Sequence, residues 1–395
     1  MLSIAGKKQT VRKQLNVYGP YLAALSIFLS SRLAMAISII FAARFVTPNP
    51  VPDSWNLPPS WCPYLLRYDS VWYLRILRDG YSYDGNNLVE HPVIFYPLYP
   101  LVSRAVTLFG ISETNALLLV SNLSILIAIP LLFKLIREDY GEVVAFYSVA
   151  LLSFFPTSMF FSAGYTESQA LLLITIFFLF LKRERYFLAA TCAGLASGTR
   201  ATGLVLLLPL LWELWVRFSQ DKRRWALTTC ACIAIATSGL WLYMIYQWIA
   251  FNTPLAFFRG RRAWESSNPS SLRKVLTLQP FRRLEEIFHD GPLPNSIDPW
   301  IFLLFIFLII YFRKKLSASY ILYVLGVLLL PYLTGSGGVI GFQSMMRYML
   351  LAFPVFIVVA GVCKERLWFG LSVVGLLAAM LFMYTTLFAQ YYWAG

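Results

Sequence analysis

The chain has 395 residues, of which 58% are hydrophobic and only 13% are charged. A soluble domain carries about a quarter charged residues, and the apolar runs here are often about 20 residues long, enough to cross a bilayer as helices. The composition therefore excludes a soluble globular domain and predicts an all-α polytopic membrane protein. The formal net charge of +14 indicates Lys and Arg flanking the spans and an anionic substrate, with no nucleic-acid partner.

Cysteine and histidine are too sparse for a framework of cross-links. Four of the five cysteines lie in or at the ends of apolar runs, so we expect no disulfide. Cys230 and Cys232 have no His nearby, which is unfavourable for zinc. Oxygen ligands for Mg²⁺ or Mn²⁺ occur in the first outer loop, at Asp69, Asp79, Asp84 and Glu90. Their spacing does not require a metal, and we predict no obligatory cofactor.

The first span is expected over residues 20–45, and basic residues within 7–13 predict an N-terminus on the inside. Arg32 lies within this span, where a charge is costly in lipid, so we expect it to face protein or a polar cavity. Further spans are expected at 115–135, 143–162, 168–181, 187–215 (two shortened helices meeting near Arg200), 226–251, 300–312, 319–333, 346–362 and 367–388. The total is about 11 spans, in a single integral membrane domain over residues 1–395.

Two long segments are expected outside: 47–114, with interfacial helices, and 252–298. Every Lys except Lys274 falls on the inner side of this topology, whereas the outer side carries almost only Arg. Arg binds phosphate in a planar, bidentate way that Lys cannot match. The outer face is therefore predicted to carry a functional basic surface.

Residues 64–83 form the most informative stretch of the first outer loop. Apolar residues recur there at helical spacing, which predicts an amphipathic helix at the membrane surface. Asp69 stands among aromatic residues, with Trp72 and Tyr73 close behind, and a partly shielded carboxylate there is a candidate general base. The structural alternative is that Asp69 pairs with Arg67 or caps the helix.

Five features collect on the outer side in this topology: Asp69, residues 165–167, Arg200, residues 257–264 and residues 343–348. Each has a structural alternative: Glu167 can cap the helix that follows, the arginines at 259–262 can bind lipid headgroups, and Arg347 can snorkel to the interface. Arg200, inside an apolar hairpin, is hard to explain by structure alone.

A base, arginines for an anionic leaving group and aromatic rings together suit transfer of a sugar from a lipid phosphate in one inverting displacement. No dinucleotide or P-loop fingerprint is present. The residues predicted to contact substrate are Arg67, Trp72, Tyr73, Glu167, Arg200, Arg261, Trp264, Arg347 and Tyr348. A transporter or flippase of an anionic lipid is the alternative, but it tends to hold its charges near the midplane between repeated helices. A purely structural membrane protein would leave the cluster unexplained.

Six ordered segments between about residues 32 and 360 resemble the PIG-V family of GPI mannosyltransferase 2-like enzymes. They read RYDSVWYLRILRDGYSY, FYPLYPLVSR, FFPTSMFFSAGYTES, GLASGTRATGLVLLLPL, NTPLAFFRGRRAW and SMMRYMLLAFPVF. The resemblance implies a GT-C membrane fold and a polyprenyl- or dolichyl-phosphate mannose donor used on the extracytoplasmic or lumenal face. It places the catalytic acid on Asp69, and donor-phosphate or substrate contacts on Arg200 and Arg347.

The resemblance also bears on location and partners. The compact chain favours a bacterial plasma membrane, with the endoplasmic reticulum membrane as the alternative. The acceptor is then a glycolipid or another glycan and need not be a GPI precursor, and Arg261 stands about where family members often have Gln. A small membrane partner subunit is a further expectation, because eukaryotic members of the family can require one.

Overall fold

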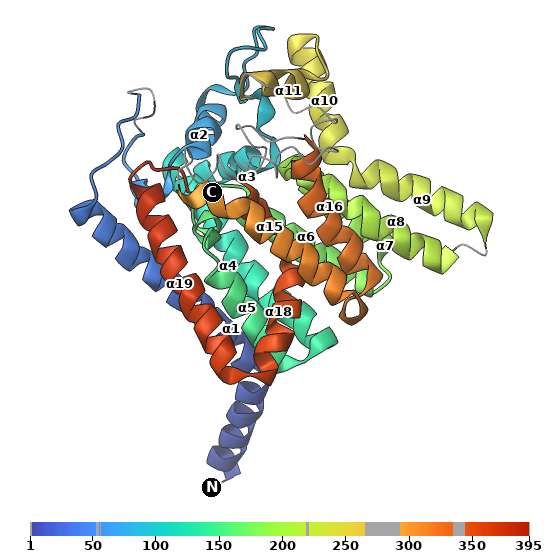
Figure 1. The fold of residues 1–395 in the computed structure, drawn as a ribbon. Helices are drawn as coiled ribbons and strands as arrows, with labels where there is room; N and C mark the ends of the chain where they lie inside the picture. The colour runs from blue at the N-terminus through green and yellow to red at the C-terminus, as the bar shows by residue number, and fades with distance from the viewer. Residues whose placement is uncertain are drawn as a thin grey trace.

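The computed structural model describes residues 2–52, 55, 57–218, 221–264, 293–334 and 344–394. This part of the chain is helical (Figure 1). Its first half contains α1 (Leu2–Phe45), α2 (Asp69–Asp79), α3 (Leu98–Thr107), α4 (Glu113–Tyr140), α5 (Glu142–Ser153), α6 (Glu167–Lys182) and α7 (Tyr186–Thr199). The second half contains α8 (Leu207–Phe218), α9 (Lys222–Ala236), α10 (Ser238–Phe251), α11 (Ala256–Arg259), α15 (Leu293–Tyr311), α16 (Ala318–Thr334), α17 (Met345–Met349), α18 (Phe353–Glu365) and α19 (Leu367–Ala389).

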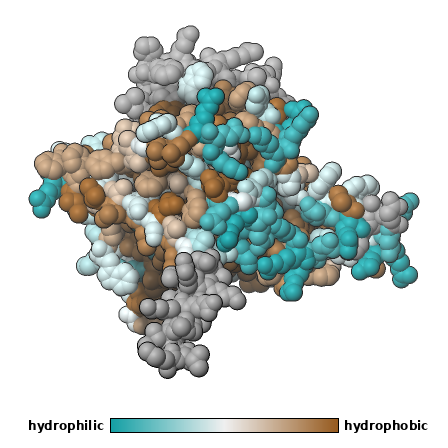
Figure 2. Space-filling model, turned by 90° about the horizontal axis from the view of Figure 1, so that it is seen from below, coloured by the Kyte–Doolittle hydropathy of each residue, from teal (hydrophilic) through white to brown (hydrophobic). Residues whose placement is uncertain are grey.

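The helices form a bundle around α4 and α5. Helix α4 packs against α1, α5 and α6, and α5 packs in turn against α18, while α19 lies along α1. The helices α2, α3 and α11 lie at the end of the bundle opposite the N-terminus (Figure 1). Seen from the N-terminal end, the surface combines a hydrophilic area with broad hydrophobic flanks (Figure 2), as expected for a protein that is embedded in a membrane.

Two helices form in the segment 47–114, where the sequence predicts them. Helix α2 begins at Asp69 and buries most of its side chains, including Val71, Leu74 and Leu77, while Arg78 and Asp79 at its end are exposed. Helix α3 begins directly after Pro97, because the fixed φ angle of proline suits the start of a helix. Both helices are too short to cross a bilayer, and they form a layer at this end of the bundle.

The all-helical membrane class is confirmed, but the expected number of spans is not. Among the described residues, three helices are long and apolar enough to cross a membrane, over Tyr18–Phe45, Glu113–Tyr140 and Leu367–Ala389. A bent pair, α9 and α10, gives a fourth if it counts as one span. Other expected spans correspond to shorter apolar helices, over Glu142–Ser153, Ile297–Tyr311 and Ala318–Leu333.

Two expected spans differ from the structure in a specific way. The segment 143–162 is helical only to Ser153 and continues past Pro156 into a short 3-10 helix, Ser158–Phe161. The segment 226–251 is bent by 54° at Thr237 between α9 and α10. By contrast, the expected break at Arg200 is confirmed, since α7 ends at Thr199 and Arg200 has an extended backbone.

Glycine lets α7 and α10 cross at very short range. A Cβ atom on Gly239 would stand 2.2 Å from the backbone nitrogen of Gly198 and 2.3 Å from the carbonyl oxygen of Gly194. Small residues at helix crossings allow this close backbone approach in membrane proteins. The crossing holds the end of α7, and with it Arg200, near α3, which packs against α7.

Arg32 is anchored inside the protein, as the sequence predicts. Its guanidinium donates to the carbonyl oxygens of Ser158 and Ser153, at 2.8 and 3.0 Å, and to the hydroxyls of Ser158 and Ser162, at 2.8 and 3.2 Å. These acceptors belong to the irregular segment between α5 and α6. One arginine of α1 therefore satisfies the backbone of the segment that leads to the start of α6.

Replacing Arg32 tests this anchor. Arg32→Met removes charged donors from acceptors in an apolar interior, so we expect the free energy of unfolding to fall by about 3 kcal/mol. Arg44→Met is the control, since Arg44 is exposed in the last turn of the same helix. This variant should change the free energy of unfolding by less than about 0.5 kcal/mol. Unfolding by SDS in mixed micelles measures both variants, and equal stability of the two would contradict the anchor.

Candidate functional site

The candidate site is built on the first turn of α2. The backbone N–H of Asp69 donates to the hydroxyl of Tyr165 at 3.3 Å, and this hydroxyl donates to the carbonyl oxygen of Arg67 at 3.0 Å. Between these two residues, Tyr68 has a φ of 52°, a conformation that is costly for a residue with a bulky side chain. A single hydroxyl thus fixes the peptide groups on both sides of a strained residue and sets the position of Asp69.

Aromatic packing holds Tyr68 in this conformation. Its ring is in contact with four others, with centroid distances of 4.8 to 6.1 Å, from Trp55, Phe388, Tyr391 and Trp393. Aromatic pairs of this kind contribute about 0.5–1.5 kcal/mol each beyond their area burial. The surrounding rings can therefore offset the backbone strain next to Asp69.

The loop before α6 lies directly against the start of α2. Ser70 Oγ donates to the carbonyl oxygen of Gly164 at 3.1 Å, and the N–H of Gly164 donates to the carbonyl oxygen of Leu65 at 3.1 Å. A Cβ atom on Gly164 would stand 2.7 Å from Leu66 Cδ2, so this approach favours glycine. The contact brings Glu167, the first residue of α6, beside Asp69.

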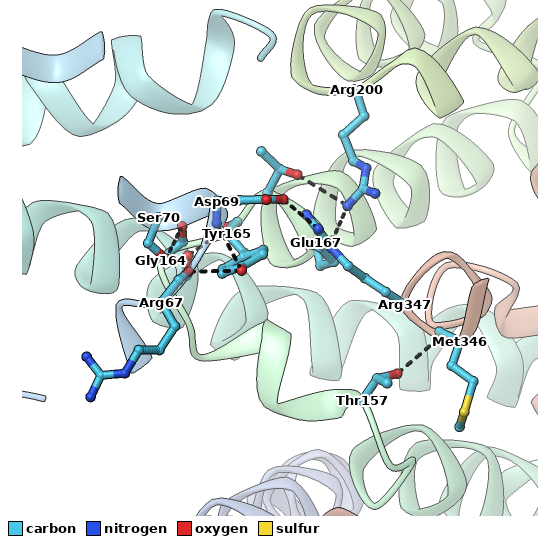
Figure 3. A network of polar contacts seen from close by, with 12 residues as sticks. Arg67, Asp69, Ser70, Thr157, Gly164, Tyr165, Glu167, Arg200, Met346 and Arg347 are labelled. Atoms are coloured by element: carbon cyan, nitrogen blue, oxygen red, sulfur yellow. Dashed lines mark hydrogen bonds and ion pairs between the residues drawn. The ribbon is translucent and has the colours of Figure 1, made fainter. Parts of the chain in front are cut away.

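Four charged side chains from different elements meet at this point (Figure 3). Arg347 Nη1 of α17 lies 2.6 Å from Asp69 Oδ2, and Arg347 Nε donates to Glu167 Oε1. Arg200 Nη1, at the end of α7, donates to the same oxygen of Glu167 and to Thr166 Oγ1 at 3.3 Å. We call Asp69, Glu167, Arg200 and Arg347 the charged cluster.

Burial separates the roles of the two acids. The side chain of Glu167 is fully buried, those of Arg347 and Arg200 are 9% and 10% exposed, and that of Asp69 is 21% exposed. A buried carboxylate that bridges two guanidinium groups orients them. Asp69 is the carboxylate of the cluster that a ligand can reach.

Aromatic rings enclose the two arginines. The guanidinium of Arg347 lies over the rings of Tyr165 and Phe160, at 4.5 and 5.2 Å from their centroids, and that of Arg200 lies over Tyr348 at 5.0 Å. Cation–π contacts of this kind add to the ion pairs. They fix the planes of both guanidinium groups without occupying all of their N–H donors.

Tyr73 and Trp72 have different surroundings. Tyr73 is buried, and both its burial and the negative charge of Asp69 raise the pKa of its hydroxyl, which places that hydroxyl near the charged cluster. Trp72 stacks on Phe95, with centroids 5.9 Å apart, and the guanidinium of Arg75 lies over its ring at 4.7 Å. Trp72 therefore packs α2 onto the residues that precede α3.

Arg67 points away from Asp69 (Figure 3). Its guanidinium donates to the carbonyl oxygens of Ala389 and Pro63, at 3.1 and 2.9 Å, and to the hydroxyl of Tyr391 at 3.1 Å. Arg67 thus ties the start of α2 to the end of α19. The ion pair between Asp69 and Arg67, which the sequence left open, does not form, because Asp69 pairs with Arg347.

Arg261 lies in the 3-10 helix Gly260–Trp264 after α11. Burial raises the pKa of Tyr96 to about 12, and the positive charge of Arg261 opposes this shift. The side chain of Trp264, predicted as a substrate contact, and Gln343 lie outside the described residues, as does the chain from 265 to 292.

An apolar groove of about 420 Å³ lies beside the site, between α2, α3, α7 and α10. Its wall includes Leu77 of α2, Leu98 and Leu101 of α3, and Gly198 of α7. Asp69 begins α2, and Arg200 follows Gly198 by two residues. The groove therefore runs along the two elements that carry one acid and one arginine of the charged cluster.

Sequence reasoning does not single out Asp298. It falls at the boundary between the expected loop 252–298 and the next span, whereas the structure includes it in α15, buried. The only sequence signal is a lone acid ahead of a long apolar run. As for metals, the described residues contain no group of three or more His, Cys, Asp or Glu that could hold an ion, and a metal-free reaction stays a prediction.

Comparison with known proteins supports the resemblance. Residues 90–249 match the family described as "Dolichyl-phosphate-mannose-protein mannosyltransferase". The chain is 27% identical over 206 residues to GPI alpha-1,6-mannosyltransferase 2 of Cricetulus griseus, covering 48% of this chain and 40% of that protein. It is 30% identical over 169 residues to GPI mannosyltransferase 2 of Drosophila pseudoobscura pseudoobscura, covering 35% and 36%, and 29% identical over 152 residues to the Homo sapiens protein, covering 36% and 30%.

The chain thus spans between 30% and 40% of the length of these relatives. Among solved structures, ArnT from Cupriavidus metallidurans bound to undecaprenyl phosphate is similar with a TM-score of 0.48 and 16% identity, over 86% of this chain and 60% of that one. A score of this size does not establish a common fold. The sequence matches, however, relate residues 90–249 to the dolichyl-phosphate-mannose-protein mannosyltransferase family and make the chain a distant homologue of the GPI mannosyltransferase 2 proteins, which confirms the resemblance.

Proposed function

We propose that this protein is an inverting mannosyltransferase that moves mannose from a polyprenyl-phosphate donor to a glycolipid or glycan acceptor. One observation carries the proposal: Asp69 is a reachable carboxylate paired with Arg347, and a buried Glu167 holds both Arg347 and Arg200 in place. A base next to a site for an anionic leaving group is what a single displacement at a sugar phosphate requires. The distant homology to mannosyltransferases agrees with this chemistry.

In the proposed reaction, the hydroxyl oxygen of the acceptor attacks the anomeric carbon of the donor sugar. Asp69 accepts the proton that this hydroxyl loses. The bond between that carbon and the phosphate oxygen breaks, and the lipid phosphate leaves with the electron pair. Arg347 and Arg200 balance the charge that develops on the phosphate. Because the leaving group is already an anion that two cations stabilise, it needs little help from a general acid.

The apolar groove suits the lipid part of the donor. A polyprenyl chain is a long hydrocarbon, and an apolar groove gives it surroundings as apolar as the lipid tails that it leaves. With the chain between α2, α3, α7 and α10, its phosphate would reach the side of the cluster formed by Asp69 and Arg200. We therefore propose that the donor enters sideways from the bilayer and that the acceptor comes from the aqueous side.

The proposal extends to location. Helix α2, which begins at Asp69, lies at the end of the bundle opposite the N-terminus (Figure 1), which the basic residues at 7–13 place inside. The site would then face the extracytoplasmic or lumenal side of a multi-pass membrane protein, with a bacterial plasma membrane favoured over the endoplasmic reticulum. The alternative, a flippase, is less well supported because the charges gather at one end of the bundle.

The role of Asp69 is tested by mannose transfer from radiolabelled polyprenyl-phosphate mannose to an extract of host lipids and glycans. Asp69→Asn keeps the size of the side chain but loses the base, so we expect kcat to fall by at least about 100-fold. Asp79→Asn, at the exposed end of the same helix, should keep near-normal activity. A folded Asp69→Asn enzyme with normal activity would disprove the base, and a rate lost on adding EDTA would disprove the metal-free reaction.

A second experiment tests the phosphate site. Arg200→Lys keeps the charge but loses the planar fork, so we expect the KM for the donor and the inhibition constant of undecaprenyl phosphate both to rise by about tenfold. Arg262→Lys, at an exposed residue of the 3-10 helix Gly260–Trp264, serves as the control for the exchange of Arg for Lys outside the charged cluster. Unchanged inhibition by the lipid phosphate in Arg200→Lys would remove Arg200 from the phosphate site.

A third experiment tests the groove. Leu101→Trp fills it from the α3 side, so we expect the kcat/KM of a long-chain donor to fall by about tenfold relative to that of a donor with a short, two-isoprene chain. Leu108 lies at the exposed C-terminus of α3, outside the groove wall. Leu108→Trp should therefore leave the ratio of kcat/KM for the long and short donors unchanged. An equal loss with both donors in Leu101→Trp would place the lipid chain elsewhere.

A further inference from the structure

The residue before Arg347 is held from three sides. The backbone N–H of Met346 donates to Asp298 Oδ2 at 3.2 Å, and its carbonyl oxygen accepts from Thr157 Oγ1 at 3.0 Å. The hydroxyl of Tyr384 contacts its sulfur at 3.5 Å. Figure 3 shows the contact between Thr157 and Met346. The three contacts come from α15, from the segment between α5 and α6, and from α19.

Helix α17 has little internal support of its own. It contains only five residues, and Ser344, which precedes it, has a left-handed backbone with a φ of 66°. A helix this short is not stable by itself. The position of the Arg347 backbone therefore depends on contacts from other elements, and those to Met346 are adjacent to it in the chain.

Asp298 is an unusual residue to find in this role. It lies in an apolar helix with only 2% of its surface exposed, and burying a carboxylate is costly unless it is hydrogen-bonded. It does not touch the charged cluster directly, and the proposed reaction does not use it. Its carboxylate accepts a hydrogen bond from the backbone that leads into Arg347.

We propose that Asp298 is a positioning residue for the transfer reaction: through the N–H of Met346 it sets the place of the Arg347 guanidinium between Asp69 and Glu167. This inference rests on the proposed function. Arg347 contacts both acids of the cluster, so a shift of its backbone displaces the phosphate site relative to the base. A misplacement of about 1 Å can cost about 100-fold in rate.

Substitutions that separate the hydrogen bond from the charge test the proposal. Asp298→Ala removes the acceptor, and we expect kcat for mannose transfer to fall by about 100-fold while the KM for the donor changes by less than about threefold. Asp298→Asn keeps an oxygen that accepts the same N–H, so it should restore kcat to within about fivefold of wild type. Such rescue by the neutral amide is not expected if only the charge of Asp298 matters.

A second pair of variants acts on the other side of Met346. Thr157→Val removes the hydrogen bond to the Met346 carbonyl and should lower kcat by about tenfold. Thr175→Val is the matched control: Thr175 is equally buried, but its hydroxyl bonds to Leu171 within its own helix. The Thr175→Val variant also loses a buried hydroxyl, but this hydroxyl has no link to Arg347. The kcat of Thr175→Val should therefore stay near that of wild type.

The measurements use purified full-length protein in detergent, with the folded fraction of each variant determined by size-exclusion chromatography and the rates normalised to it. Normal kcat in Asp298→Ala, or an Asp298→Asn variant as slow as Asp298→Ala, would overturn the inference and leave the proposed function standing. Equal losses in Thr157→Val and Thr175→Val would also overturn it, because they would indicate a general effect of packing. Wild-type protein that transfers no mannose would instead overturn the proposed function, and the inference with it.

Discussion

A fully buried carboxylate, Glu167, is the interaction on which the site depends. Two arginines from different helices donate to one of its oxygens, and neither could lie so close to the other without it, because two buried cations repel strongly at short range. The charge of Glu167 therefore determines the fold locally as well as the chemistry. It ties the start of α6 to the end of α7 and to α17, and through Arg347 it reaches Asp69 on α2.

The neighbouring backbone is shaped to make this convergence possible. Gly164 permits the loop before α6 to touch the start of α2, and the hydroxyl of Tyr165 holds the peptides around Tyr68. The strained φ angle of Tyr68 persists because aromatic rings surround it and Arg67 fastens the preceding residue to the end of α19. A strained residue directly before a candidate base suggests that the position of Asp69 is worth its cost in folding free energy.

Much of this could be predicted from local sequence. The period of apolar residues predicts α2, and the cost of a charge in lipid predicts that Arg32 faces protein or a polar cavity; both predictions are confirmed. The partner of Asp69 could not be predicted, because Arg67 is near in sequence whereas Arg347 approaches from 278 residues away. The bend at Thr237 was missed for a similar reason: an apolar run of the right length does not reveal that helix packing divides it. Asp298 was missed because a lone acid beside an apolar run has no periodicity to mark it.

The cluster contains two cations and two anions, so its formal charge is balanced before any donor binds. A phosphate that enters must therefore share Arg347 with Asp69, because Arg347 Nη1 already lies 2.6 Å from that carboxylate. Glu167 does not compete for this exchange, since it is buried and bridges both arginines. Sharing Arg347 with the donor would weaken the hold on Asp69 and make its oxygen more available to a hydroxyl proton. On the proposed function, the pairing of Arg347 with Asp69 thus links donor binding to the readiness of the base.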